Sequence, residues 1–230
     1  MCIFLIAQGI YTVSLFNEAE LQAINAKLKD ASAEDIIQWA LDLKRKTLVT
    51  TNFRPLEGVI LHCVNKLDRS VPVICIDHGY NTEKTYHVGA AISEALQLDV
   101  HYYTPKVTAA RRAATLGGVP SIEDIAAHDA FTEEVKLEPF SRAMAEFQPE
   151  VWFTAIRAEQ TAFRADMEAI SQDSRTGVIK VAPFLSWTEL DMEEYLYNND
   201  LDFEEGYDDA GYNDPTKALA NRECGLHTGK

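Results

Sequence analysis

A cysteine near the carboxyl end of the chain stands where a thiol could do chemistry. Cys224 lies in the stretch RECGLH, after Arg222 and Glu223 and before Gly225. Its polar neighbours and the lack of a periodic apolar pattern argue against burial in a core. Basic groups such as Arg222 and His227 favour the thiolate, which is the nucleophilic form of cysteine. Cys224 is therefore a candidate nucleophile, although its position alone is equally compatible with an incidental surface thiol.

Hydroxyl, amide and basic side chains gather in or near loops that follow predicted strands. TTNFRPLEG opens a helix after one strand, IDHGY follows a second, and IRAEQTAFR follows a later one, with KLEPFSR just upstream. Backbone N–H groups at a helix start bind anions, and guanidinium groups bind phosphate or sulfate. Each stretch alone is also compatible with an ordinary turn or a surface ion pair. The candidate residues are Thr50, Thr51, Asn52, Arg54, Asp77, Gly79, Lys136, Arg157, Gln160 and Arg164.

The other cysteines are Cys2, Cys63 and Cys75. Cys63 lies in the apolar helical run VILHCV and Cys75 in the apolar run VPVICID, which predicts that both are small buried hydrophobic residues. No two of the four cysteines form a CxxC or CC pair, so the spacing predicts neither a metal site nor an iron–sulfur cluster. Without a secretion signal, free thiols of this kind indicate a reduced, cytoplasmic protein.

The elements that must position these residues alternate along the chain. Short β-rich runs are separated by longer helical patterns, and Ser32 with Asp35 gives the capping box of one such helix. The alternation predicts an α/β fold, a parallel five-stranded sheet with helices on both faces. In such sheets ligands bind beyond the carboxyl ends of the strands, where the candidate loops lie. The strands are predicted at residues 47–51, 71–77, 99–103, 150–156 and 177–183.

Charge and organisation limit the partners. The 230 residues carry a formal net charge of -15, which disfavours binding to nucleic acid or an anionic membrane. Residues 1–31 are expected to form an extension, whose apolar opening is too short to span a bilayer. It would pack on the core or contact a second copy in a homodimer. Residues 32–200 are expected to form the α/β domain, and residues 201–230, rich in acids and glycines, a mobile tail.

The sequence resembles the phosphoadenosine phosphosulfate reductase family in six stretches that occur in this order: TTNF, IDHGY, EKTY, KLEPFSRAM, IRAEQTAFR and ECGLH. That family belongs to the adenine nucleotide alpha hydrolase-like superfamily. The resemblance covers roughly residues 32–230, and ECGLH is its most specific part. It implies that the thiolate of Cys224 attacks the sulfur of 3′-phosphoadenosine 5′-phosphosulfate (PAPS). An enzyme S-sulfocysteine then remains, and reduced thioredoxin or glutaredoxin discharges it as sulfite.

The resemblance also implies roles for the other candidates. Thr50, Thr51 and Asn52 would line a phosphate loop, and Asp77 and Gly79 would border the adenosine. Lys136, Arg157 and Arg164 would contact phosphate or sulfate near Gln160, and Arg222 and His227 would join them when the tail closes.

The sequence departs from the family pattern in two places. Arg54 stands where the family commonly has glycine or another small residue, and the tail between Gly206 and Cys224 is shorter than in many relatives. Members that use adenosine 5′-phosphosulfate usually carry extra cysteines for a [4Fe–4S] cluster. The cysteine count therefore indicates PAPS and no bound cofactor. Two alternatives stay open: a cluster-free adenosine 5′-phosphosulfate reductase, and a non-catalytic nucleotide-binding homologue.

Overall fold

The computed structural model describes residues 15–121, 123–173 and 176–201. Cys224, Arg222 and His227 lie outside these ranges, as does the predicted tail after Leu201. Residues 1–14 of the predicted N-terminal extension also lie outside them.

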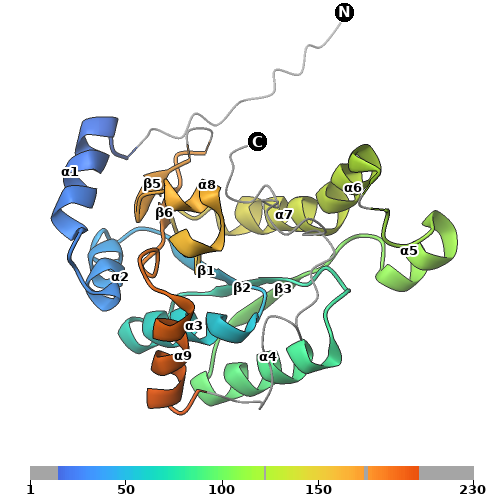
Figure 1. The fold of residues 1–230 in the computed structure, drawn as a ribbon, viewed down its shortest axis with the longest axis horizontal. Helices are drawn as coiled ribbons and strands as arrows, with labels where there is room; N and C mark the ends of the chain where they lie inside the picture. Colours follow the sequence, from blue (N-terminus) through green and yellow to red (C-terminus); the bar gives the residue numbers. More distant parts are fainter. Residues whose placement is uncertain (1–14, 122, 174–175, 202–230) are drawn as a thin grey trace, which may run out of the picture.

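The α/β prediction is confirmed, and the sheet is mostly parallel (Figure 1). Within the described residues it has six strands in the order β3-β2-β1-β4-β6-β5, where the sequence predicted five. The additional strand is β5, which pairs antiparallel with β6. It is only three residues long and contains a single apolar residue, so no alternating pattern marks it in the sequence. The strands are β1 Thr47–Thr51, β2 Val73–Ile76, β3 Val100–Tyr103, β4 Val151–Phe153, β5 Ile170–Gln172 and β6 Ile179–Val181.

Helices connect the strands, and several begin where the sequence predicts. Ser32 and Asp35 form the capping box of α2, and Thr188 with Asp191 forms that of α9. The α-helices are α1 Glu18–Leu28, α2 Ala33–Asp42, α3 Gly58–Leu67, α4 Glu83–Leu96, α5 Ala109–Leu116, α6 Ile125–Thr132, α7 Glu138–Phe147, α8 Ala162–Ala165 and α9 Glu189–Asn198. Short 3₁₀ turns occur at η1 Pro55–Glu57 and η3 Ala158–Gln160, and a π turn at η2 Glu133–Leu137.

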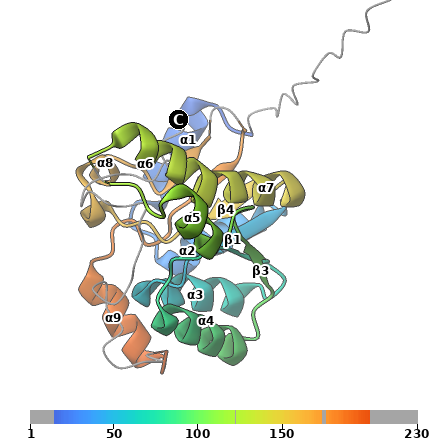
Figure 2. The ribbon, with the colours of Figure 1, turned by 90° about the vertical axis from the view of Figure 1, so that its right-hand side faces the viewer.

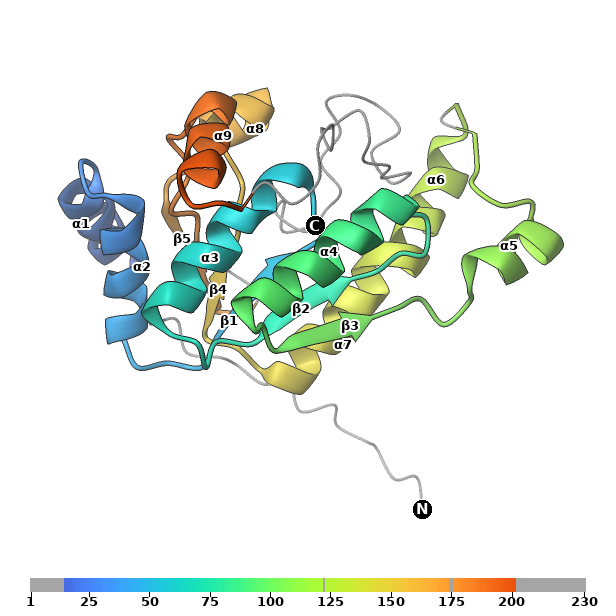
Figure 3. The ribbon, with the colours of Figure 1, turned by 90° about the horizontal axis from the view of Figure 1, so that it is seen from below.

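The sheet is covered on both faces because side chains alternate along each strand. Leu48 and Trp152 point to the face covered by α7, where Phe140 packs against them. Val49 and Phe153 point the other way, into the larger core formed with α2, α3, α4 and α9. Figure 2 shows the sheet between α7 and the pair α3 and α4, and Figure 3 shows α3 and α4 side by side across one face.

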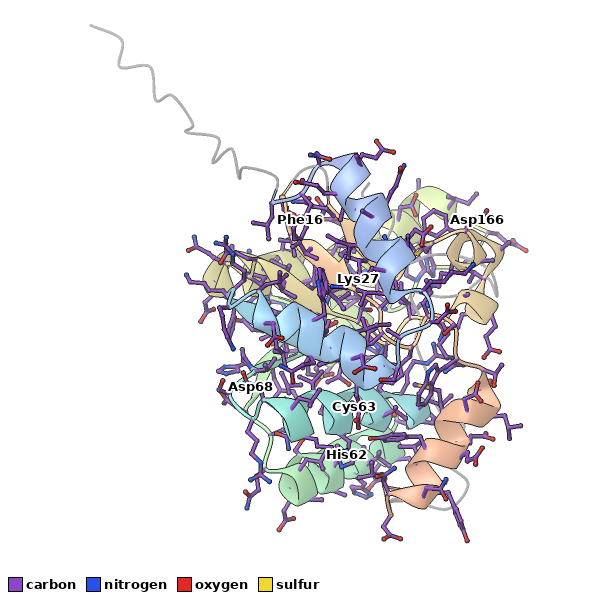
Figure 4. The ribbon with its side chains drawn as sticks, turned by 90° about the vertical axis from the view of Figure 1, so that its left-hand side faces the viewer. Phe16, Lys27, His62, Cys63, Asp68 and Asp166 are labelled. Atoms are coloured by element: carbon purple, nitrogen blue, oxygen red, sulfur yellow. The ribbon has the colours of Figure 1, made fainter. Side chains whose placement is uncertain are left out.

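Helix α1 covers the β5 edge of the sheet. The side chain of Asn25 donates to the backbone oxygen of Ile170 at 2.8 Å and accepts from its backbone nitrogen at 2.9 Å. This pairing satisfies groups that an edge strand would otherwise expose. Phe16 and Lys27 lie on this side of the molecule (Figure 4). In the described part of the chain, helices with the length and apolarity to cross a membrane are absent.

Candidate active site

A small cleft opens at the carboxyl ends of β1 and β4. The strand order changes direction here, because β1 lies between β2 and β4. A change of this kind is where doubly wound sheets bind ligands. The cleft has a volume of about 90 Å³.

The structure brings together eight of the ten candidate residues that it describes. Asp77 and Gly79 are the two that do not line the cleft. Sequence reasoning missed Glu57 and His78, which do line it. The eight are Thr50, Thr51, Asn52, Arg54, Lys136, Arg157, Gln160 and Arg164.

The loop after β1 pairs its own donors with its own acceptors. The Thr51 hydroxyl and the Asn52 backbone N–H both donate to Glu57 Oε2, each at 2.7 Å. The Phe53 N–H donates to Thr51 Oγ1 at 2.9 Å, and the Arg54 N–H to Asn52 Oδ1 at 3.2 Å. Donors that the sequence assigns to an anion therefore already have acceptors within the loop. Glu57 could have been noticed, because it is an acid in the first turn of the helical segment that TTNFRPLEG opens.

Phe53 holds this loop in an unusual backbone conformation. Its φ of 55° lies in the left-handed region, which is unfavourable for a residue with a side chain. Phe53 is 4% exposed, and its ring lies against Gly89 of α4. A Cβ at Gly89 would come within 3.0 Å of the ring, so glycine makes room for it. Burial of the ring thus stabilises a strained backbone beside the cleft.

The loop after β4 supplies two buried guanidinium groups. Arg157 and Arg164 are each 5% exposed. Gln160 Oε1 accepts from the backbone N–H of Arg157 at 3.0 Å and from Nη1 of Arg164. Arg157 Nε donates to Glu159 Oε1 at 3.1 Å, and its Nη2 lies 3.7 Å from Glu189 Oε2 on α9. These contacts fix the position of both arginines at the wall of the cleft.

Lys136 reaches the cleft from a π turn. The turn, η2, joins α6 to α7, and Lys136 within it is 4% exposed. A π turn inserts an extra residue into a helix and often occurs at functional sites. The sequence placed this lysine near a helix but carried no signal for the turn itself.

Asp77 and Gly79 form a tight turn after β2. Gly79 has a φ of 78°, which glycine adopts without steric cost. Asp77 Oδ1 accepts from the Gly79 N–H and the Tyr86 hydroxyl, both at 2.9 Å, and from Asn81 Nδ2 at 3.4 Å. Burial and the bond to Asp77 raise the pKa of Tyr86 to about 12. The adenosine contact assigned to this turn stays a prediction.

Positive charge is concentrated at the cleft. Of its charged lining residues, Arg54, Lys136, Arg157 and Arg164 are basic and Glu57 is acidic. In a chain with a net charge of -15, this local excess of cations produces a positive field in the cleft. Groups of three or more His, Cys, Asp or Glu side chains placed to hold a metal are absent from the described residues. The arrangement suits a phosphate or sulfate group.

The two cysteines in the described ranges are unsuited to nucleophilic chemistry. Both are buried. Burial raises the pKa of the Cys63 thiol to about 11, although its hydrogen bond with Tyr195 acts in the opposite direction. Burial also raises the pKa of Cys75 well above its ordinary value. Both thiols therefore stay protonated at neutral pH, and the candidate nucleophile Cys224 lies outside the described residues.

A larger hollow of about 1120 Å³ lies between α1 and the segment that contains β5. Its charged lining residues are Glu18, Lys29, Glu168 and Asp173, with acids in excess. It therefore lacks the excess of cations that an anion site needs. We assign the chemistry to the smaller cleft, because basic side chains converge there at the strand ends.

The chain is similar to proteins of known name and structure. The family model of the phosphoadenosine phosphosulfate reductase domain matches residues 47–213. A phosphoadenosine 5′-phosphosulfate reductase of Synechococcus sp. is 30% identical over 90% of this chain and 97% of that protein. Its counterpart in Klebsiella pneumoniae is 31% identical over 91% of this chain and 92% of that protein. The crystal structure of phosphoadenylyl-sulfate (PAPS) reductase from Candida auris, a phosphate complex, has the same fold. Its TM-score is 0.71 at 24% identity, over 80% of this chain and 88% of that chain.

Proposed function

The chain belongs to the phosphoadenosine phosphosulfate reductase family, and we propose that it reduces PAPS to sulfite and adenosine 3′,5′-bisphosphate with a thioredoxin-type protein as electron donor. The observation that carries the proposal is the cationic cleft at the ends of β1 and β4. Arg157, Arg164 and Lys136 converge there. Guanidinium and ammonium groups at a strand-end site suit the phosphate and sulfate groups of a sulfonucleotide.

Cys224 is the proposed nucleophile. Its thiolate attacks the sulfur of the sulfate group, the bond from that sulfur to the bridging oxygen breaks, and the electron pair leaves with adenosine 3′,5′-bisphosphate. The enzyme then carries an S-sulfocysteine. A thioredoxin thiolate attacks the Cys224 sulfur, and sulfite leaves with the electron pair of the S–S bond. The second thioredoxin thiol resolves the mixed disulfide and restores Cys224.

The described residues bind and stabilise charge in this mechanism. Gln160 holds the Arg164 guanidinium and Glu159 holds that of Arg157, so both groups meet an anion without first being ordered. Together with Lys136 they neutralise the charge that develops on the leaving phosphate oxygen. The tail that carries Cys224 is proposed to meet the cleft and the thioredoxin in turn, with Arg222 and His227 joining the site.

Intact-mass spectrometry of the reduced protein mixed with PAPS, without thioredoxin, tests the proposal. We expect the mass to rise by one sulfo group, which peptide mapping places on Cys224. Reduced thioredoxin should then release sulfite. Cys224→Ser should bind the nucleotide and gain no mass. Cys63→Ala is the matched control, because this thiol is buried, and it should be labelled like the wild type.

An unchanged mass in a protein that binds PAPS would refute Cys224 as its nucleophile. A mass gain with adenosine 5′-phosphosulfate alone would identify the nucleotide that lacks the 3′-phosphate as the substrate. Binding of both nucleotides without any mass gain would identify a nucleotide-binding protein without reductase activity.

A further inference from the structure

The guanidinium of Arg157 is shared between two carboxylates. Nε donates to Glu159 Oε1 at 3.1 Å, and Nη2 lies 3.7 Å from Glu189 Oε2. The Arg157 side chain is 6% exposed, whereas that of Glu189 is 58% exposed. The arginine is therefore fixed, while the Glu189 carboxylate can move into water at little cost. Glu159 belongs to the same loop as Arg157, but Glu189 is the first residue of α9.

The other end of α9 is attached to the opposite side of the cleft. The Tyr195 hydroxyl lies 2.9 Å from His62 Nδ1 on α3, the helix that follows the loop after β1. Leu196 lies against Gly58, the first residue of α3, where a Cβ would be 3.2 Å from Leu196 Cδ2. Figure 4 shows His62 on α3, with α9 on the same side of the molecule. Helix α9 therefore links the loops after β1 and β4, although none of its residues lines the cleft.

Helix α9 is also the element from which the chain continues toward Cys224. The backbone N–H of Leu201 donates to the Leu196 oxygen at 2.9 Å, and Leu201 is 7% exposed. These contacts set the point at which the last described residue leaves the helix. A change in the position of α9 would thus move Leu201.

We propose that Glu189 is a positioning residue that competes with the anionic group of the substrate for Arg157. The inference rests on the proposed function, because it needs a phosphate or sulfate group at this arginine. An anion there neutralises the charge that attracts Glu189, so the contact at the first residue of α9 is lost. Tyr195 and Leu196 keep the other end of the helix on α3. By linkage, Glu189 weakens anion binding by the same factor by which the anion weakens the Glu189 contact.

Glu189→Gln removes the competing charge and preserves the shape of the side chain. Calorimetry at low ionic strength should show adenosine 3′,5′-bisphosphate binding roughly twofold to fivefold tighter, the range of an exposed ion pair. Glu193→Gln is the matched control, because it removes the same charge from the same helix. Glu193 is exposed, and no ion pair forms on it within the described residues. Its effect should be smaller, and the difference between the two variants should shrink at high salt.

A second readout follows α9 itself. The Met192 N–H donates to the Thr188 oxygen at 3.2 Å in the first turn of the helix. Saturating bisphosphate should speed hydrogen exchange at this amide in the wild type. The effect should be smaller in Glu189→Gln, where the ion pair with Arg157 is already absent.

Equal affinities of the wild type and both variants would overturn the inference, and so would slower exchange at Met192 with bisphosphate bound. Tighter binding by Glu189→Gln in a protein that forms no sulfite would support the inference and refute the proposed activity. A wild-type protein that does not bind the bisphosphate would refute both.

Discussion

Replacing Glu57 with glutamine should destabilise the loop after β1 and at the same time strengthen anion binding. Glu57 Oε2 accepts two hydrogen bonds of 2.7 Å, from Thr51 and Asn52. Glutamine keeps an acceptor oxygen but loses the charge that makes such bonds roughly twice as strong. Each bond to a charged group contributes about 1.5–3 kcal/mol, against about 0.5–1.5 kcal/mol for a neutral one. Because the loop borders an open cleft, we expect a total loss of about 1–2 kcal/mol in the free energy of unfolding.

The gain in anion affinity follows from the lost charge. At an effective dielectric constant of about 20, a unit charge about 8 Å from an anion repels it by about 2 kcal/mol. Removing that charge should tighten the binding of adenosine 3′,5′-bisphosphate by roughly tenfold or more. Thermal unfolding and calorimetry in one buffer measure both effects. The midpoint should fall by about 2–8 °C, since 1 kcal/mol shifts a chain of this size by about 2–4 °C.

Glu146→Gln is the control for this experiment. Glu146 accepts a hydrogen bond of 2.6 Å from the Tyr103 hydroxyl and does not line the cleft. Its replacement should lower stability and leave anion affinity nearly unchanged. If Glu57→Gln weakens both the fold and anion binding, the carboxylate shapes the anion site, and the reasoning that it competes with the anion is wrong.

Two further perturbations test the elements around the cleft. Gly89→Ala should lower the free energy of unfolding by about 1 kcal/mol. Overpacking against the Phe53 ring destabilises by about 1–3 kcal/mol, and the higher helix propensity of alanine offsets about 1 kcal/mol of this loss. Urea unfolding measures this loss. Ala90→Gly is the control, because it measures the effect of helix propensity alone on the same helix. A Gly89→Ala variant more stable than the wild type would contradict the packing argument. Hydrogen bonds from Thr188 lower the pKa of Asp191, so its stabilisation is present above the ordinary value of 3.8 and is lost as the pH falls through the lowered value. Asp191→Asn should therefore be less stable than the wild type at neutral pH and equally stable in strong acid, and a gap that persists in acid would exclude this origin.

The sequence predicted the strands better at their centres than at their ends. Residues 47–51 were predicted as a strand and form β1. The other predicted strands are shorter in the structure: residues 71–77 contain β2 only at Val73–Ile76, and residues 150–156 contain β4 only at Val151–Phe153. Pro72 lacks the N–H that a strand ladder needs, which shortens β2 at its start. At its other end, the Asp77 carboxylate accepts a hydrogen bond from the Gly79 N–H, which forms a turn. The ends of strands depend on such local backbone effects, and the pattern of apolar residues does not reveal them.

The residues of the candidate site were predictable where they follow strands in the sequence. Thr51, Arg157 and Arg164 were found because parallel strands bring their carboxyl ends to one edge of the sheet. The contact between Glu189 and Arg157 was not predictable, because it joins residues 32 positions apart through the packing of α9. The π turn at Lys136 was not predictable from the sequence either, because an α-helix and a π turn have the same apolar pattern over so few residues.

The hydrogen bonds within the cleft imply that an anion binds there by exchange. Asn52 and Thr51 donate to Glu57, and Arg157 contacts Glu159 and Glu189. A buried donor without an acceptor costs about 1–3 kcal/mol, so these internal partners stabilise the folded chain. The same partners reduce affinity, because an incoming anion gains only the difference between its own contacts and those it replaces. A group able to contact both loops at once replaces both sets in one event, which favours two adjoining anionic groups, as in a phosphosulfate, over a single free ion.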